Sequence, residues 1–204
     1  MTIFGDLLEE LRKTHLGVNI HSIHNIPSDQ MLSPVEERLA ELGIPYDEVI
    51  YFTPTEDEEH NTVYGQHICA AGATSFFLKD GTANSTIFMN GNIGKLTNTE
   101  DSELENILKY IFLIHEIGHA EDFNKQINFH HTTRKVDLVS AEAYADIFTL
   151  KHLKSSKNPA MKLARKYYCK NILANTASNE FYKAVFTKVK KSFLESKVRE
   201  WARA

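Results

Sequence analysis

Apolar residues recur every three or four positions over several stretches of the chain, which is the period of an amphipathic α-helix. The stretch from Phe4 to Leu11 has this period and Gly17 closes it, so it predicts a helix near the N-terminus. The stretch from Ser33 to Gly43 predicts a second short helix, because it has a capping serine, a proline at the first helical position and a terminal glycine.

Shorter stretches rich in β-branched and aromatic residues lie between and after these two helices. Residues 18–26 alternate enough to predict a strand, and residues 48–53 and 62–72 are further strand candidates. Residues 74–90 predict two strands joined around the turn sequence KDGTAN, which is a β-hairpin. The region from residue 48 to residue 93 is therefore expected to form a sheet.

Helical patterns dominate from residue 101 to the end of the chain. Ser102, followed three residues later by Glu105, has the pattern of a capping box and leads into an apolar stripe over residues 104–114. Three further helical stretches follow, over residues 137–153, 158–173 and 178–204. In the last stretch apolar residues recur at intervals of four, at Phe181, Val185, Val189 and Phe193. Packing into the core is the preferred role of this face, and docking on a partner is the alternative.

The composition is that of an ordinary globular protein. With 204 residues, 42% of them hydrophobic, and a formal net charge of -4, the chain is long enough to bury a core, and it has no basic excess that would indicate nucleic-acid binding. Its two cysteines, Cys69 and Cys169, cannot form a disulfide framework or a CxxC metal site. No segment approaches the ~18 apolar residues of a membrane span, and no basic leader precedes an apolar run. The expectation is a soluble cytoplasmic protein.

Ionisable residues directly follow the apolar stripe, in the sequence HEIGH. His115 and His119 are four residues apart, which places both imidazoles on one side of a helix and within reach of one ion. Glu116 lies about 100° further round the helix axis, where it reaches a water on the metal and not the metal itself. This HExxH pattern predicts a zinc site with Glu116 as general base. The alternative is a buried helix whose histidines form hydrogen bonds within the core.

A catalytic zinc usually has three protein ligands and keeps a fourth position for water. Glu142 and Asp146 lie 23 and 27 residues beyond His119, on one face of the next predicted helix. This interval leaves room for a loop and for the second helix to return beside the first. Glu142 is the predicted third ligand, and Asp146 is predicted to accept a hydrogen bond from the outer nitrogen of a ligating histidine. The alternative is that both acids face solvent.

Other polar residues compete for roles in this site. His131 could complete a three-histidine site, but the spacing HExxHxxGxxH fails because Asp122 and Lys125 occupy its last two positions. His130 or His131 could instead donate to developing oxyanion charge, against the alternative of an ordinary loop histidine. Weaker candidates for that donor, none of them assigned, are Tyr144, Tyr168 and His152.

The sequences HEIGH and EAYAD together resemble the HExxH plus ExxAD signature of gluzincin zinc metallopeptidases. The resemblance covers roughly residues 85–150. It implies His115, His119 and Glu142 as zinc ligands, Glu116 as catalytic base and Asp146 as hydrogen-bond partner of a ligand. The HEIGH helix and the following Glu-Ala pair also resemble the small cytosolic peptidases of the ImmA/IrrE type. The implied fold is α+β and zincin-like, with a small, mostly antiparallel sheet packed on the active-site helix and a helical C-terminal part.

These features predict one zincin-like domain over residues 1–204, with N-terminal helices (1–45), the sheet and metal-binding helices (46–156) and C-terminal helices (157–204). The expected function is zinc-dependent hydrolysis of peptide bonds in a protein or peptide substrate, with the strand STIFMNG as the edge of the cleft. One alternative is a catalytically silent zinc-binding regulatory or interaction module, and another is a hydrolase of a non-peptide amide. The substrate, the subfamily and the oligomeric state stay open.

Overall fold

The structure of the chain is a computed structural model. It describes residues 18–23, 49–50, 53–54, 72–79, 82–90, 93, 100–155 and 159–204. The helices predicted from Phe4 and from Ser33, and nearly all of the strand candidate at 62–72, lie outside these residues. The strand predicted at 18–26 is confirmed over Val18–Ile23.

The described part of the chain contains seven strands and five helices. The strands are β1 (Val18–Ile23), β2 (Val49–Ile50), β3 (Thr53–Pro54), β4 (Gly72–Lys79), β5 (Thr82–Asn90), β6 (Phe129–His130) and β7 (Lys135–Val136). The helices are α4 (Ser102–Lys125), α5 (Leu138–Ser155), α6 (Pro159–Ser178), α7 (Glu180–Val189) and α8 (Glu195–Arg203).

The predicted hairpin is confirmed and forms the centre of the larger sheet. Strands β4 and β5 pair antiparallel, with Thr74 opposite Ile87, and the strand order is β1-β5-β4-β2. Strand β2 pairs antiparallel with β4, whereas β1 pairs parallel with β5. The sheet is therefore mostly antiparallel, as predicted. A second small sheet has the order β3-β7-β6.

The prediction that STIFMNG forms the edge of the sheet is wrong. This stretch belongs to β5, which lies between β1 and β4. The error has a physical reason, because a strand more than sixty residues earlier in the chain adds in parallel alongside it. Long-range parallel pairing of this kind leaves no mark on the local sequence pattern.

Helix α4 carries the HEIGH sequence and starts one residue away from the predicted cap. Asp101, and not Ser102, is the N-cap: its backbone is extended, and its carboxylate accepts the backbone N–H groups of Glu103 and Leu104 at 2.9 and 3.2 Å. Asp and Ser are comparable caps, so the pattern alone did not separate two neighbouring candidates. The helix ends at Lys125, and Gln126 closes it in the left-handed conformation (φ 52°).

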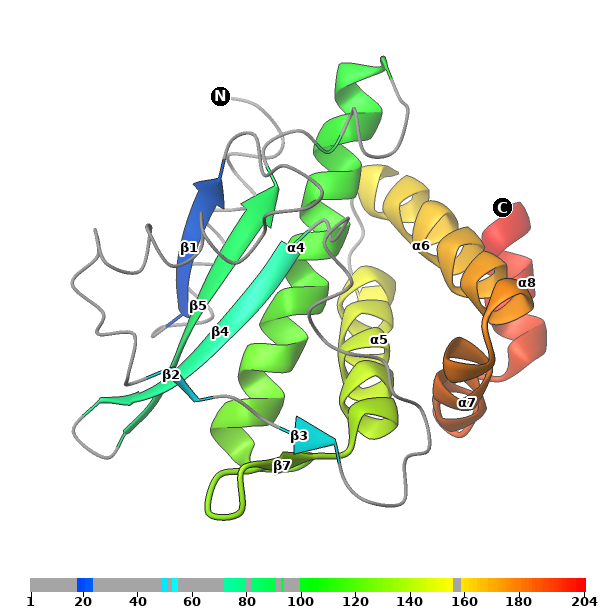
Figure 1. Cartoon of the computed structure of the whole chain (residues 1–204). Helices are drawn as coiled ribbons and strands as arrows, with labels where there is room; N and C mark the ends of the chain where they lie inside the picture. The colour runs from blue at the N-terminus through cyan, green and yellow to red at the C-terminus, as the bar shows by residue number, and fades with distance from the viewer. Residues whose placement is uncertain are drawn as a thin grey trace.

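Helix α4 lies between the sheet and α5, and helices α6 to α8 lie on the side away from the sheet, where α6 contacts both α4 and α5 (Figure 1). Phe76 of β4 joins the sheet to α4, because its ring lies 4.5 Å from that of Phe123 and 4.8 Å from that of Phe129. Side chains buried in this way contribute about 1.5–3 kcal/mol each. The largest fully buried side chains in the described part of the chain are Ile87, Ile93, Ile111, Leu113, Ile114, Ile117, Phe123, Phe129 and Leu150.

The C-terminal helical stretches differ from their predicted bounds. Helix α6 continues to Ser178, past the predicted end near Leu173. The stretch predicted over 178–204 is divided into α7, which Asn179 caps by accepting the Phe181 N–H at 2.8 Å, and α8. All four residues of the predicted apolar face are buried in the core, which confirms the packing role of that face. In the described residues no helix is long and apolar enough to cross a bilayer.

Gly118 allows α4 and α5 to approach closely. A Cβ atom at this position would lie 2.8 Å from the Ala145 Cα and 3.3 Å from the Phe148 Cβ. Because the nearest atom belongs to the backbone of α5, the two helices would have to move apart. This contact holds the helix of His115 and His119 against the helix of Glu142.

Replacement of Gly118 by alanine is expected to lower the free energy of unfolding by about 1–3 kcal/mol, as overpacking does in a filled interior. The sign is diagnostic, since the same change inside an unconstrained helix stabilises by about 1 kcal/mol. Chemical denaturation of both proteins measures the difference. An unchanged or higher stability would contradict the close approach of α4 and α5.

Candidate metal centre

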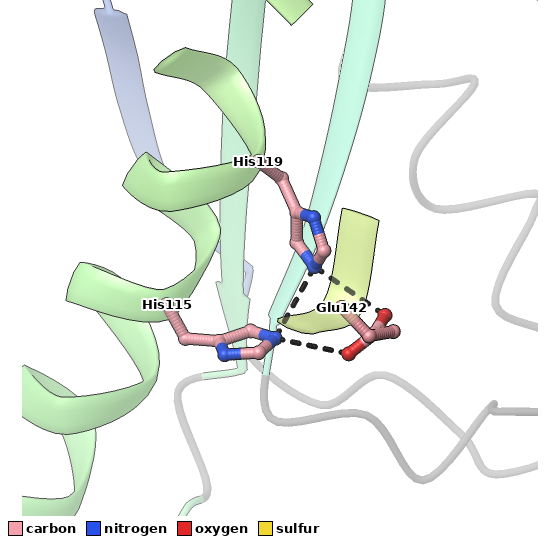
Figure 2. A group of neighbouring side chains, drawn as sticks. All are labelled: His115, His119 and Glu142. Atoms are coloured by element: carbon pink, nitrogen blue, oxygen red, sulfur yellow. Dashed lines mark hydrogen bonds and ion pairs between the residues drawn. The ribbon is translucent and has the colours of Figure 1, made fainter. Parts of the chain in front are cut away.

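The structure brings His115, His119 and Glu142 together from two neighbouring helices. The histidines lie one turn apart on α4, and the short β6 and β7 strands return the chain so that Glu142 on α5 faces them (Figure 2). The two Nε2 atoms are 3.2 Å apart. The Glu142 carboxylate places Oε2 3.3 Å from the His115 Nε2 and Oε1 3.4 Å from the His119 Nε2. All three donor groups therefore converge on one point.

These distances fit a single tetrahedral metal ion. Zinc bonds of about 2.0–2.1 Å to nitrogen or oxygen, set at the tetrahedral angle, put neighbouring ligand atoms about 3.3 Å apart. The two Nε2 atoms, 3.2 Å apart, lie within 0.1 Å of that value, and each Nε2 lies 3.3 or 3.4 Å from a different oxygen of the Glu142 carboxylate. Among the described residues, this is the cluster whose histidine, cysteine or carboxylate atoms could hold a metal ion. The residues that the sequence predicted as ligands therefore have the geometry of a ligand set.

The charges of the cluster are complementary. Burial raises the pKa of Glu142, but the charge of His119 and hydrogen bonds from both histidines outweigh it, so the pKa falls far below its usual range. Burial lowers the pKa of His115, but the Asp146 and Glu142 carboxylates outweigh it, so this pKa lies well above its usual value. Glu142 is thus anionic at neutral pH, and the site favours a positive charge between these side chains.

His119 is buried more deeply than its partners. The residue is 5% exposed, and its Nδ1 atom has no hydrogen-bond partner among the described residues. A buried polar atom left without a partner costs about 1–3 kcal/mol. A strong interaction at the opposite atom, Nε2, would offset that cost, and Nε2 is the atom that faces His115 and Glu142.

Glu116 lies outside the cluster, as its position on the helix predicts. It is partly buried, and its Oε2 accepts a hydrogen bond of 2.6 Å from the Thr74 hydroxyl on β4. The second carboxylate oxygen has no such bond to Thr74. The carboxylate of Glu116 is therefore separate from the carboxylate of Glu142, which faces the histidines.

Asp146 lies one turn beyond Glu142, behind His115. Its Oδ1 is 3.5 Å from the His115 Nδ1, and the Tyr168 hydroxyl lies closer, 2.8 Å from the same nitrogen. The Tyr168 hydroxyl also donates to the Asp146 Oδ1 at 2.5 Å. Burial and the charge of Asp146 raise the pKa of Tyr168 well above its usual value, so the phenol stays neutral.

The other competing residues, Tyr168 apart, have partners away from the cluster. His131 lies 3.0 Å from the Phe123 carbonyl oxygen, and His130 is exposed on β6. The Tyr144 hydroxyl donates to Glu121 at 2.8 Å. His152 forms a 2.7 Å hydrogen bond with the Tyr110 hydroxyl. The structure therefore gives none of these residues a contact with the three donor groups.

Two residues near the site were not found from the sequence. Thr74 was not singled out, because a threonine in a strand carries no pattern that marks contact with a helix forty-two residues later. Tyr182 of α7 is partly buried, and burial together with the charges of Glu142 and Asp146 raises its pKa to about 12. Tyr182 is therefore a neutral phenol within the electrostatic reach of both carboxylates.

Comparison of the chain with protein-family models, with curated proteins and with solved structures finds no match. The case for function therefore depends on the geometry of the cluster and on the chemistry of its residues.

Proposed function

We propose that the protein is a zinc-dependent hydrolase of peptide bonds, of the gluzincin class and with a zincin-like arrangement of sheet and helices. The observation that carries the proposal is the convergence of two imidazoles and one carboxylate: the two Nε2 atoms are 3.2 Å apart, and each lies 3.3 or 3.4 Å from one oxygen of Glu142. Two imidazoles and one carboxylate are the ligand set of catalytic zinc sites that keep a fourth position for water. A purely structural zinc site would need no further carboxylate, whereas Glu116 lies beside this one.

The chemistry that a zinc ion supplies in such a site is Lewis acidity, which lowers the pKa of a water molecule to about 7 and polarises a carbonyl oxygen. His115, His119 and Glu142 would hold the ion, and their net charge of -1 would leave the site with a net positive charge that can polarise a carbonyl. Glu116 accepts a proton from the attacking water and later delivers it to the leaving amine. The Thr74 hydroxyl holds Oε2 of Glu116, so that Oε1 is the atom that receives the proton.

The position of Thr74 supports an extended peptide as the substrate. In the described residues, β2 pairs with β4 at Phe76 and Phe77, whereas Thr74 lies two residues further along β4 and contacts Glu116. An extended peptide bound beside Thr74 would have a peptide bond next to Glu116. We therefore place the substrate beside Thr74 of β4 in this proposal, in place of β5.

Removal of the metal is the direct test of the proposal. Purified protein is expected to contain about one zinc per chain, to hydrolyse an unfolded protein such as casein, to lose this activity with a chelator, and to regain it with added zinc. Elemental analysis and the release of new amino termini measure the two quantities. Protein that takes up no zinc, or that hydrolyses casein equally well after chelation, would refute the proposal.

Replacement of Thr74 by valine is expected to lower kcat about tenfold, because misplacing a catalytic group by about 1 Å can cost up to about a hundredfold. Valine keeps the shape of threonine and removes the hydroxyl that binds the Glu116 Oε2. Zinc content and KM should stay near wild-type values, since Thr74 contacts none of the three proposed ligands. Thr74→Ser retains the hydroxyl and should recover most of the activity. Equal kcat values for valine and threonine would show that Glu116 needs no such anchor.

A further inference from the structure

The side of His115 that faces away from the cluster is enclosed by the C-terminal part of the protein. Its Nδ1 atom points toward Tyr168 on α6, a helix that carries none of the proposed ligands. Tyr168 is 3% exposed. A polar group at this depth needs hydrogen-bond partners, and those of the Tyr168 hydroxyl include the His115 Nδ1 and the Asp146 Oδ1, with the Thr149 side chain also in contact.

The protons along this chain of groups have one consistent arrangement when a metal is bound. With Nε2 of His115 bonded to the ion, the imidazole is neutral and its proton is on Nδ1, so Nδ1–H donates. The Tyr168 oxygen accepts that bond at 2.8 Å and its own proton goes to the Asp146 Oδ1 at 2.5 Å, because a carboxylate can only accept. The direct separation of 3.5 Å between Nδ1 and Oδ1 is long for a hydrogen bond.

We propose that Tyr168 is a positioning residue of the metal centre, through which Asp146 orients His115. The inference rests on the proposed metal site. It adds a hydrogen-bond chain that runs from His115 on α4 through Tyr168 on α6 to Asp146 on α5. Tyr168 fixes the tautomer and the ring plane of His115, and Asp146 acts on the ligand by binding the tyrosine hydroxyl. Groups that orient a ligating histidine typically change metal affinity by about 10–100-fold.

Zinc affinity, measured by competition with a chromogenic chelator, tests the proposal without reference to hydrolysis. Tyr168→Phe keeps the ring and removes the hydroxyl, and it is expected to weaken zinc binding about tenfold. Tyr167→Phe is the matched control, since Tyr167 is the neighbouring tyrosine on α6 and contacts Lys170 instead of the cluster. It should stay within about twofold of wild type. Thermal unfolding of the metal-free proteins shows whether the fold is retained.

A second pair of variants separates the relay from direct contact. If Asp146 acts through Tyr168, then Asp146→Asn should weaken zinc binding in wild type and add less than about twofold in the Tyr168→Phe background, as expected for residues that act as one unit. If Asp146 acted directly on His115, Asp146→Asn would weaken binding equally in both backgrounds. That second result, or wild-type affinity in Tyr168→Phe, would overturn the proposal.

A spectroscopic measurement reports on the bond itself. In zinc-loaded protein labelled with nitrogen-15 histidine, the His115 Nδ1–H proton should give a resolved, slowly exchanging resonance, identified by its loss in His115→Gln. The resonance should be lost or exchange faster in Tyr168→Phe and persist in Tyr167→Phe. Persistence in both variants would mean that the hydroxyl does not accept this proton.

These results also distinguish the two proposals. Weakened zinc binding in Tyr168→Phe, in a protein whose wild type hydrolyses nothing, would support the relay and refute the hydrolase. Hydrolysis by wild type together with unchanged zinc affinity in Tyr168→Phe would do the reverse. A wild-type protein that binds no zinc would refute both.

Discussion

Replacement of Glu142 by alanine is expected to weaken zinc binding by about a hundredfold or more. Structural zinc sites with four ligands gain about 10–16 kcal/mol on binding, so one ligand accounts for roughly 3 kcal/mol, which is about a hundredfold in affinity. Glu142 also supplies the only negative charge among the three proposed ligands. Its removal leaves only the two imidazoles, whose Nε2 atoms are 3.2 Å apart, as proposed ligands. Neither imidazole supplies a negative charge to the ion.

A second carboxylate on the helix of the histidines provides the control. Glu121 lies two residues beyond His119, accepts hydrogen bonds from Tyr144 and Lys125, and is not part of the cluster. Glu121→Ala should therefore bind zinc with wild-type affinity, although it loses contacts at the surface. Equal zinc affinity in Glu142→Ala and wild type would remove Glu142 from the ligand set and transfer the third position to another residue.

The residues that the sequence predicted best are those whose roles depend on one helix. The spacing of His115, Glu116 and His119 follows from the helical repeat, so it predicted two histidines on one side and the glutamate beside them, and the structure has this arrangement. Glu142 was predicted to lie beside the histidines although a loop separates it from them in the chain. It does lie there, because α5 returns beside α4 at Gly118. Predictions of this kind succeed when the local repeat decides which way a side chain points.

Contacts between distant segments were not predictable in the same way. Thr74 meets Glu116, and Tyr168 meets His115, across forty-two and fifty-three residues of chain. Nothing in a short window marks either contact, because a threonine in a strand and a tyrosine in a helix have many roles. The parallel addition of β1 to β5 escaped prediction for the same reason.

Tyr168 shows how a residue can be noticed in the sequence although its neighbours in the fold are not predicted. The sequence offered it as a weak candidate to stabilise oxyanion charge. The structure places its hydroxyl behind His115, against Asp146, where the ligating side of the imidazole faces the other way. The helical repeat gives the face of a residue on its own helix, but it does not say which neighbouring helix that face will meet.

Replacement of Glu116 by glutamine is expected to lower kcat for peptide hydrolysis by about 10²–10⁴-fold, the usual contribution of a general acid–base residue. The change keeps the size of the side chain, and the amide oxygen can still accept the Thr74 hydroxyl hydrogen bond, so the position of the side chain should be retained. What is lost is the ability to take a proton from water and return it to the leaving amine. KM should change little, because binding of the ground state does not require proton transfer.

The same variant separates an enzyme from a silent metal-binding module, provided that zinc content is measured on the same sample. Glu116→Gln should contain as much zinc as wild type, since Glu116 lies outside the cluster. Glu105→Gln, which changes a partly exposed ion pair with Lys109 on the same helix, is the control and should leave kcat unchanged. Full zinc content with hydrolysis lost supports catalysis by Glu116. Full zinc content with casein hydrolysis equal to that of wild type would show that Glu116 is not the general base of the reaction.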